Sequence, residues 1–508
     1  MVARWIYRYK LHLNERIIKI NIGIIKKIDF GEIDGYGDPN LGKYFLDNNY
    51  WQKVIDDNVF FVVGKKGTGK FSIYQMIEHE SFEKGCLVIN KDFGEFPFEK
   101  LLNLRDDDFS RPNQYQTIWK NVIFNLFIQA IAKLPEEENE YYKEIKKYQE
   151  IYLGNSLDLH KDIISTTTKT QGSLIAHGLG LSRERGVQCD FKFDNNNITT
   201  INSCLFKLLE NYFITTSFGR KIVIQFDRLD DNYNQYQDAE EYYQAMISLF
   251  KAVYNFNQAL RSKSVSCAKV VLYIRTDIMK AMASRDAESA RWDDFRFDLD
   301  WRVNSIKDIY QSNLYKMVRK RINVSCPEAT DKNFDEIFAP ERDLEAECNG
   351  LDFFKVLVLQ TLFRPRDLIK LLKTLQKSIC DKGRLNSASY HEALKKYSNW
   401  LVNTEIANEI NPVLKDDYLY VIELLRLCGS RNLTVKTFSS RYDSVKHAFK
   451  LKPLELLNFL YSVGIIENSW KNNALGKYMH RSIFRNEGDF DRNLGFRIIP
   501  AVWNGLTV

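Results

Sequence analysis

The sequence predicts a three-layer α/β fold in which a parallel sheet lies between helices. Four short apolar runs recur along the chain at wide spacing, at residues 59–63, 86–90, 221–226 and 269–274. They are rich in β-branched and aromatic residues and apolar on both faces, as central strands of a parallel sheet are. Helical patterns separate them at 114–133, 198–212 and 238–260. This alternation is typical of a sheet that helices cover on both faces.

The first predicted strand leads directly into a glycine-rich turn. Residues 59–70 read VFFVVGKKGTGK, which matches the phosphate-loop pattern GxxxxGK in full. Glycines let successive backbone N–H groups surround a phosphate, and the N-terminus of the following helix favours negative charge. A lysine at the end of the loop reaches the β- and γ-phosphates. We therefore predict a P-loop NTPase domain whose ATP-binding residues are Gly64, Lys65, Lys66, Gly67, Thr68, Gly69, Lys70, Phe71 and Ser72.

The loop departs from the pattern at one position. Phe71 stands where a Ser or Thr hydroxyl normally binds Mg²⁺, and Ser72 follows one residue later. Ser72 is thus the candidate replacement ligand for the metal. The departure predicts slow hydrolysis.

The second motif, KIVIQFDRLDD at 221–231, is an apolar strand that ends in Asp227. An aspartate at this place holds Mg²⁺ through water, so Asp227 is a candidate metal and catalytic residue. Asp230 and Asp231 follow and either could orient the attacking water, while Arg228 occupies the position of the usual second acid. A buried strand ending in a solvated acidic turn would give the same pattern.

The third motif, KVVLYIRTD at 269–277, places Arg275 at the carboxyl end of a neighbouring strand. Ligands of open parallel sheets bind at that end, so Arg275 is a candidate sensor of the γ-phosphate. A salt bridge to Asp277 or Asp230 is the alternative.

The fourth motif, FRPRDL at 363–368, opens a predicted helix. Arg366, or its neighbour Arg364, could point at the nucleotide and couple its state to a helical lid. The alternative is a capped surface helix with solvated charges.

After about residue 303 the strand signals fade. Helical patterns cover 305–321 and 351–378, and three more helices precede a strand-like run at 464–466. That order is the pattern of a winged helix. The predicted divisions are an N-terminal extension at 1–35, a P-loop ATPase domain at 36–325 with an insertion at about 135–200, a helical lid at 326–405 and a winged-helix-like domain at 406–508.

The stretch 431–452 of the winged-helix-like region carries only Asp443 as an acidic residue and six basic residues, namely Arg431, Lys436, Arg441, Lys446, Lys450 and Lys452. The third helix of this region, at 453–463, is apolar on most sides, whereas a base-reading helix exposes Arg, Asn or Gln. The pattern favours packing or protein contact and leaves contact with the DNA backbone open.

Composition narrows the classes of function that remain. The net charge of +6 over 508 residues permits contact with nucleic acid but does not indicate it. The eight cysteines show no CxxC spacing, so neither a metal cluster nor a disulfide framework is indicated, and a reducing cytoplasm fits. No run approaches 18 apolar residues, so we expect no membrane span.

The segments GKKGTGK, FDRLDD, YIRTD and RPRDLI, in this order, resemble bacterial P-loop ATPases of the KAP and STAND branches, which are related to AAA+ proteins. The resemblance covers about residues 35–380. It implies a regulatory switch that uses ATP and Mg²⁺ in a multi-subunit assembly, often in defence against phage beside a separate effector protein.

Three functions therefore stay open: a slowly hydrolysing ATPase switch, an ATP-dependent DNA-binding protein of the initiator or transposition-helper type, and a nucleotide-binding scaffold without turnover. We also expect a homo-oligomer. In this oligomer, we expect Arg285, Arg291 or Arg296 to reach the nucleotide of a neighbouring subunit. The alternative is that the segment carrying them, residues 284–298, is a solvated charged helix.

Overall fold

The computed structural model describes residues 22–94, 101–102, 111, 113–135, 139–153, 198–216, 221–229, 239–303, 305–474, 476–484 and 488–506. It divides into two compact units. The first lies within Met1–Leu46, Gly67–Gly69 and Asp300–Val508, and the second within Asp47–Lys66 and Lys70–Leu299. The extension at 1–21 and most of the predicted insertion lie outside the described residues. The four-part division of the chain stays a prediction.

The second unit is built on a five-stranded parallel sheet with the order β2-β3-β4-β1-β5. The strands are β1 Phe61–Gly64, β2 Cys86–Asp92, β3 Lys221–Asp227, β4 Ala268–Arg275 and β5 Arg296–Asp298. All four predicted strands are confirmed. The edge strand β5 was not predicted, because three residues with alternating charge give no apolar run.

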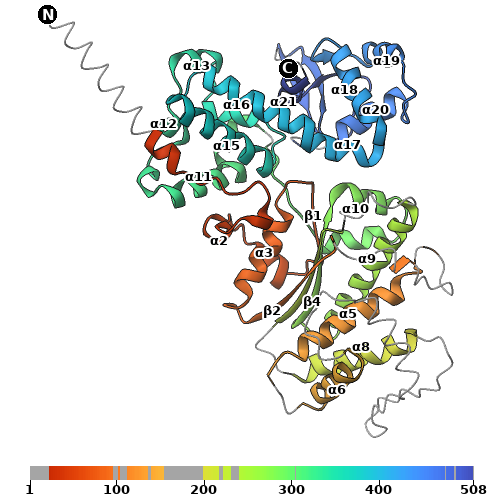
Figure 1. The fold of residues 1–508 in the computed structure, drawn as a ribbon. Helices are drawn as coiled ribbons and strands as arrows, with labels where there is room; N and C mark the ends of the chain where they lie inside the picture. Colours follow the sequence, from red (N-terminus) through yellow and green to blue (C-terminus); the bar gives the residue numbers. More distant parts are fainter. Residues whose placement is uncertain are drawn as a thin grey trace, which may run out of the picture. The chain divides into compact units, whose positions relative to one another are not determined.

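Helices cover both faces of this sheet, so the predicted three layers are present. In Figure 1, α3 lies on one face, and α5 and α9 lie on the other. The helical segments of this unit are η2 Gln52–Asp56, α3 Lys70–Ser81, α5 Gln116–Ile131, α6 Glu140–Tyr148, η3 Gln149–Leu153, α8 Ile198–Thr215, α9 Ala239–Ser262, α10 Thr276–Ala283 and η5 Ser289–Phe295. Together, this sheet and its glycine-rich loop are consistent with a P-loop NTPase-like fold.

The core of the second unit explains why α5 is apolar all round. It packs against α8 and α9 as well as toward the sheet, and a helix with neighbours on every side buries every face. Trp119 of α5 is fully buried and donates its indole N–H to the carbonyl oxygen of Ala245 in α9 at 2.9 Å. This bond satisfies the polar atom of a side chain that otherwise only packs.

The first unit begins with residues 22–27, which are helical and bury Ile24 and Ile25. Its helical part is η1 Gly35–Gly37, α2 Leu41–Tyr44, η6 Ile306–Gln311, α11 Asn313–Ser325, η7 Pro327–Ala329, α12 Phe334–Phe338, α13 Arg342–Glu347, α14 Phe353–Leu359, α15 Pro365–Lys382, α16 Ser387–Trp400, η8 Leu401–Ile406 and α17 Ala407–Leu414. α15 and α16 pack against each other along their length. The helical content predicted after residue 303 is confirmed.

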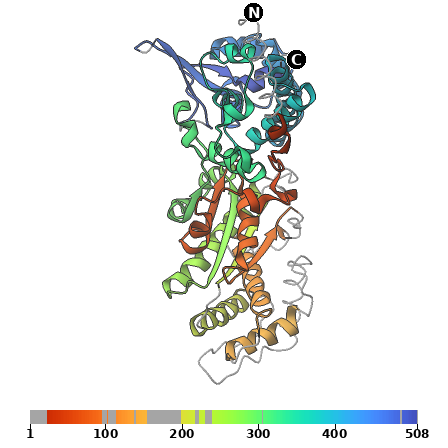
Figure 2. The same cartoon turned by 90° about the vertical axis from the view of Figure 1, so that its left-hand side faces the viewer.

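The C-terminal part of the first unit carries an antiparallel sheet with the order β6-β9-β7-β8. Its elements are η9 Lys415–Asp417, α18 Tyr418–Leu427, β6 Asn432–Leu433, α19 Val435–Ser444, α20 Pro453–Ser462, β7 Ile466–Asn472, β8 Lys477–Arg481, β9 Gly495–Ile498 and α21 Pro500–Leu506. The predicted order of three helices before a strand is present. In Figure 2, β7 and β8 form a blue arm that extends from the rest of this part. The description of residues 406–508 as a winged-helix-like domain stays a prediction.

Among the described residues, Cys86, Cys267, Cys326, Cys348, Cys380 and Cys428 are free thiols. Cys204 is disulfide-bonded, which departs from the expectation of reduced thiols, and its partner lies outside the described residues. Of the helices described, none has the length and apolar character needed to cross a bilayer.

Candidate functional site

The glycine-rich loop joins β1 to α3 through two left-handed residues. Gly67 has φ +78° and Gly69 has φ +89°, which side-chain-bearing residues rarely adopt. A Cβ on Gly67 would lie 3.2 Å from Cβ of Arg366, within the first unit, whereas one on Gly69 would meet nothing within 4 Å. The backbone conformation alone therefore requires glycine at position 69.

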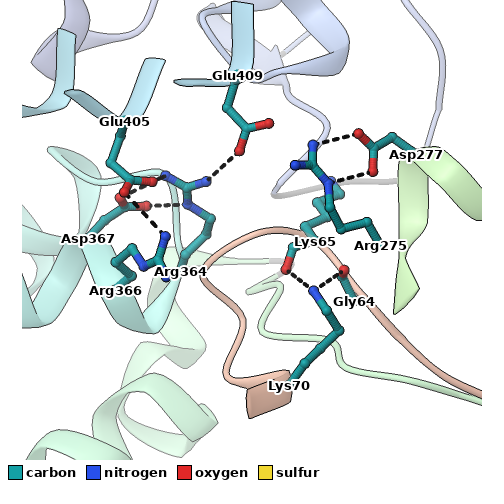
Figure 3. Close-up of polar contacts among 10 residues, drawn as sticks. All are labelled: Gly64, Lys65, Lys70, Arg275, Asp277, Arg364, Arg366, Asp367, Glu405 and Glu409. Carbon is teal, nitrogen blue, oxygen red and sulfur yellow. Dashed lines mark hydrogen bonds and ion pairs between the residues drawn. The ribbon is translucent and has the colours of Figure 1, made fainter. Parts of the chain in front are cut away.

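Lys70 is the first residue of α3 and folds its side chain back onto the loop. Its Nζ donates to the carbonyl oxygens of Gly64 at 3.0 Å and Lys65 at 3.3 Å (Figure 3). The first turn of an α-helix also has backbone N–H groups without partners inside the helix. A cation and a helix N-terminus at one loop make a site suited to phosphate.

The strand register places further predicted residues at the same edge of the sheet. Gly64 is level with Arg275 on the neighbouring strand β4, and Asp92 of β2 is level with Asp227 of β3. All of these strands are parallel, so their carboxyl ends meet at one edge. Asp227 is buried, with 4% of its surface exposed.

Arg275 forms a two-pronged ion pair with Asp277. Its Nε and Nη2 atoms lie 3.0 and 2.6 Å from the two carboxylate oxygens (Figure 3). Burial acts to raise the pKa of Asp277, but the guanidinium group of Arg275 outweighs it and lowers that pKa. The salt bridge that the sequence offered as an alternative is thus observed, and the sensor role stays a prediction.

Asp92 is a carboxylate at this edge that the sequence motifs did not reveal. The side chain of Arg228 donates from Nη1 to Oδ2 of Asp92 at 2.9 Å. Arg228 itself has φ +59°, an uncommon conformation for a residue other than glycine. The sequence offered one signal for it, an acidic residue shortly after the second predicted strand.

A ladder of side-chain hydrogen bonds links β2, β3 and β4 two residues before Asp227, the last residue of β3. Gln225, fully buried in β3, donates to Oδ1 of Asn90 in β2 at 2.9 Å and accepts from the hydroxyl of Tyr273 in β4 at 2.5 Å. Buried polar groups with partners on both sides specify one register. These bonds therefore fix β2, β3 and β4 relative to one another, and with them Asp92 and Asp227.

The metal-binding prediction rests on Ser72 and Asp227. In place of the usual hydroxyl, the Phe71 ring packs against Tyr74, with ring centres 5.5 Å apart. Within the described part of the chain, no cluster of three or more His, Cys, Asp or Glu side chains is arranged to hold a metal ion. Mg²⁺ keeps several waters and binds few protein carboxylates beside phosphates, so the predicted site would not need such a cluster.

In the first unit, Arg364 belongs to a buried ion network. Its guanidinium group lies 2.6 and 2.9 Å from the two oxygens of Asp367, and 3.5 Å from Glu405 (Figure 3). Arg364 is 3% exposed and Asp367 is fully buried. These contacts assign Arg364 to the interior of the helical part.

Arg366 lies at the first turn of α15 and its Nη1 donates to Glu405 at 3.2 Å. Its backbone N–H donates to the carbonyl oxygen of Gly67 at 3.4 Å, and Trp301 donates to that of Thr68 at 2.9 Å. These partners all belong to the first unit. Arg366 thus contacts the loop, while its contact with nucleotide stays a prediction.

Other predicted residues are not brought together. Asp230 lies outside the described residues. Arg285 pairs with Glu240 at 2.9 Å, and Arg296 with Asp298 at 2.8 Å. The segment that carries these arginines is not wholly solvated, because Trp292 is buried and packs on Phe61 and Phe250.

Known proteins resemble this chain over spans of different length. Residues 312–404 match the family model of the FunZ-associated C-terminal helical domain. The chain is 21% identical over 513 residues to the "Putative transposon gamma-delta 80.3 kDa protein" of Escherichia coli strain K12, covering 95% of this chain and 67% of that protein. A search of solved structures finds Cdc6p of Pyrobaculum aerophilum at 11% identity and a TM-score of 0.26, over 84% of this chain and 83% of that one. This structural likeness is too low to support an argument. The family model covers α11 to α16, so it overlaps the predicted helical lid at 326–405 and the last residues of the predicted P-loop ATPase domain.

Proposed function

We propose that this protein is an ATP-binding ATPase that hydrolyses slowly and acts as a regulatory switch in an assembly. The observation that carries the proposal is Lys70, whose amine lies on the loop carbonyls at the start of α3. The level placement of Gly64 with Arg275, and of Asp92 with Asp227, supports it further. Backbone N–H groups, a lysine and an acidic strand end are the groups that phosphoryl transfer uses.

The residues that would hold the nucleotide follow from this arrangement. The loop backbone and Lys70 would bind the phosphates, Asp227 would hold Mg²⁺ through water, and Ser72 would stand in for the missing hydroxyl. Mg²⁺ would neutralise charge on the phosphates when bound. Arg228 pairs with Asp92, and its guanidinium group has no acceptor atom, so it does not replace the second acid.

The direct test is Lys70→Ala. Losing a charged contact to phosphate costs ~2–4 kcal/mol, so ATP affinity should fall ~30- to 1000-fold. Isothermal titration calorimetry measures it, with exposed Lys143→Ala in α6 as the matched control. Equal affinity in wild type and Lys70→Ala would remove the proposal. ATP binding without any phosphate release by the wild type would favour the scaffold instead.

A second candidate is an ATP-dependent DNA-binding protein of the transposition-helper type. The name of the E. coli relative, which mentions a transposon, favours it. Lys436, Arg441, Lys446, Lys450 and Lys452 are exposed in the region proposed as a winged helix. Tyr478 is 67% exposed on the β7–β8 arm, beside exposed Lys477. ATPase activity that rises with DNA and falls steeply with salt would favour this candidate.

The finer proposal of a switch beside a separate effector rests on the resemblance to KAP and STAND proteins. It includes the helical lid at 326–405 and self-association. Co-purification from the native host with the products of neighbouring genes tests it. A chain that copurifies with no partner and is active alone would argue against a separate effector.

A further inference from the structure

A cavity of about 200 Å³ lies in the first unit. The turn that precedes α15 lines one side of it, with Thr361 and Phe363. Arg431, Glu467, Ser482 and Arg497, from the C-terminal sheet and its flanks, line the rest. A volume of this size holds a small solute or several waters.

The ionisable side chains of this cavity carry unequal charge. Nε of Arg497 donates to Oε1 of Glu467, which is buried. Arg431 donates from Nε to the carbonyl oxygen of Ile498 at 2.9 Å and, among the described residues, forms no ion pair with a carboxylate. Two guanidinium groups thus face one carboxylate. Burial, and then the charge of Arg497, lower the pKa of Arg431 to about 10, although Glu467 acts to raise it.

Two further features of the lining point to a ligand. Ser482 is 2% exposed and lines the cavity. A serine hydroxyl can donate a hydrogen bond to an oxyanion. Phe363 has φ +56°, and strained backbone of this kind concentrates at functional sites.

We propose that this cavity binds a phosphate group, either as inorganic phosphate or on a small phosphomonoester. Arg431 and Arg497 would donate from their Nη atoms, and Ser482 from its hydroxyl. These donors come from three separate segments, near β6, in β9 and after β8. Donors from several directions suit a tetrahedral oxyanion better than a planar carboxylate, and a guanidinium fork matches two of its oxygens.

The test is thermal unfolding of the full chain with added inorganic phosphate, against sodium chloride at equal ionic strength. A ligand that binds the folded state raises the unfolding temperature with its concentration. Phosphate could also bind the loop at Lys70, so each measurement is repeated in the Lys70→Ala variant. Stabilisation should persist in Lys70→Ala, and this separates the cavity from the nucleotide site.

Arg431→Met should weaken the phosphate effect about tenfold to hundredfold, and Ser482→Ala should weaken it severalfold. Arg431→Lys keeps the positive charge but loses the two-pronged donor geometry of the guanidinium group, and it is the variant to use if Arg431→Met does not fold. Exposed Arg441→Met in α19 is the matched control and should change nothing. Glycerol 3-phosphate that stabilises more than phosphate would identify a phosphomonoester. The proposal is overturned if wild type shows no phosphate effect, if acetate stabilises equally, or if the Ser482 and Arg431 variants keep the wild-type concentration dependence.

Discussion

Asp92 shows what a single residue contributes at the edge of the parallel sheet. It is level with Asp227 on the next strand, and it pairs with the arginine that occupies the position of the usual second acid. We expect Asp92→Asn to lower kcat about 100-fold, in the range of a lost acid–base group, with ATP affinity nearly unchanged. Steady-state ATPase assays and calorimetry measure the two quantities.

Arg228→Ala separates two roles of Asp92. If Asp92 acts on its own, Arg228→Ala keeps most of the rate; if Asp92 only positions Arg228, both variants lose the rate equally. Exposed Asp443→Asn in α19 is a control for the loss of a carboxylate. Wild-type kcat in Asp92→Asn would refute a part for this carboxylate in turnover.

At the scale of residues, the sequence predicted what lies in one contiguous motif. Lys70 and Asp227 follow directly from a strand and its end, so their place at the sheet edge needed no knowledge of pairing. Asp92 and the ladder through Gln225 depend on the register between strands, and register cannot be read from one strand alone. The roles of Arg364 and Arg366 depend on Glu405, about 40 residues away.

At the scale of elements, the ion network of Arg364 joins the start of α15 to η8. Arg364→Met would leave the fully buried Asp367 without its cation, which costs ~3–5 kcal/mol, while Glu405 would keep Arg366 as a partner. Arg366→Met removes a partly exposed pair and should cost less than ~1 kcal/mol. Hydrogen exchange of the α15 amides in increasing urea measures both. Equal loss of protection in the two variants would contradict the assignment of Arg364 to the interior.

Lys269, at the start of β4, gives the second unit a pH dependence. Its amine donates to the carbonyl oxygens of Val54 and Asp57, and burial, with Lys221 acting in the same direction, lowers its pKa to about 7. In the unfolded chain a lysine stays protonated to about pH 10. Between about pH 7 and 10 the unfolded state therefore binds more protons, and this residue's contribution to stability rises with pH.

Lys269→Met removes the titrating group. The free energy of unfolding of wild type relative to the variant should rise by up to about 1.4 kcal/mol per pH unit from pH 7 to 10. Urea denaturation at several pH values measures this difference, with hydrogen exchange of the β4 amides as the readout of unfolding. Parallel pH profiles for the two proteins would show that the pKa of Lys269 is not lowered on folding.

The elements that were predicted share a long apolar pattern, as in β3, β4, α5 and α9. Those that were missed are short or polar. β6 has two residues and β5 has three, so no periodicity can mark them. β8 carries exposed Lys477 and Tyr478, and its pairing with β7 becomes evident only in three dimensions.

At the scale of the whole molecule, the open question is whether the site is complete in one chain. Arg285 and Arg296 are engaged in ion pairs within the chain, with Glu240, and with Asp293 and Asp298. Arg291 is 64% exposed and pairs only at 3.4 Å with Glu288 among the described residues. It is therefore the most accessible of the three candidates for contact with a neighbouring subunit.

A mixing experiment tests a contribution of Arg291 in trans. Arg291→Ala subunits would bind ATP but lack the arginine, and Lys70→Ala subunits would lack ATP but present the arginine. If an arginine from a neighbour stabilises charge in the transition state, each variant alone should lose most of its rate, because such a group contributes about 10³-fold or more. Mixed together, the two variants should recover part of the ATPase rate at the Arg291→Ala sites.

Exposed Arg384→Ala in the first unit is the control and should keep the full rate. Sedimentation with and without ATP reports the assembly in parallel. A strict monomer with undiminished ATPase activity, or inactive variants that never complement each other, would rule out the in-trans arginine.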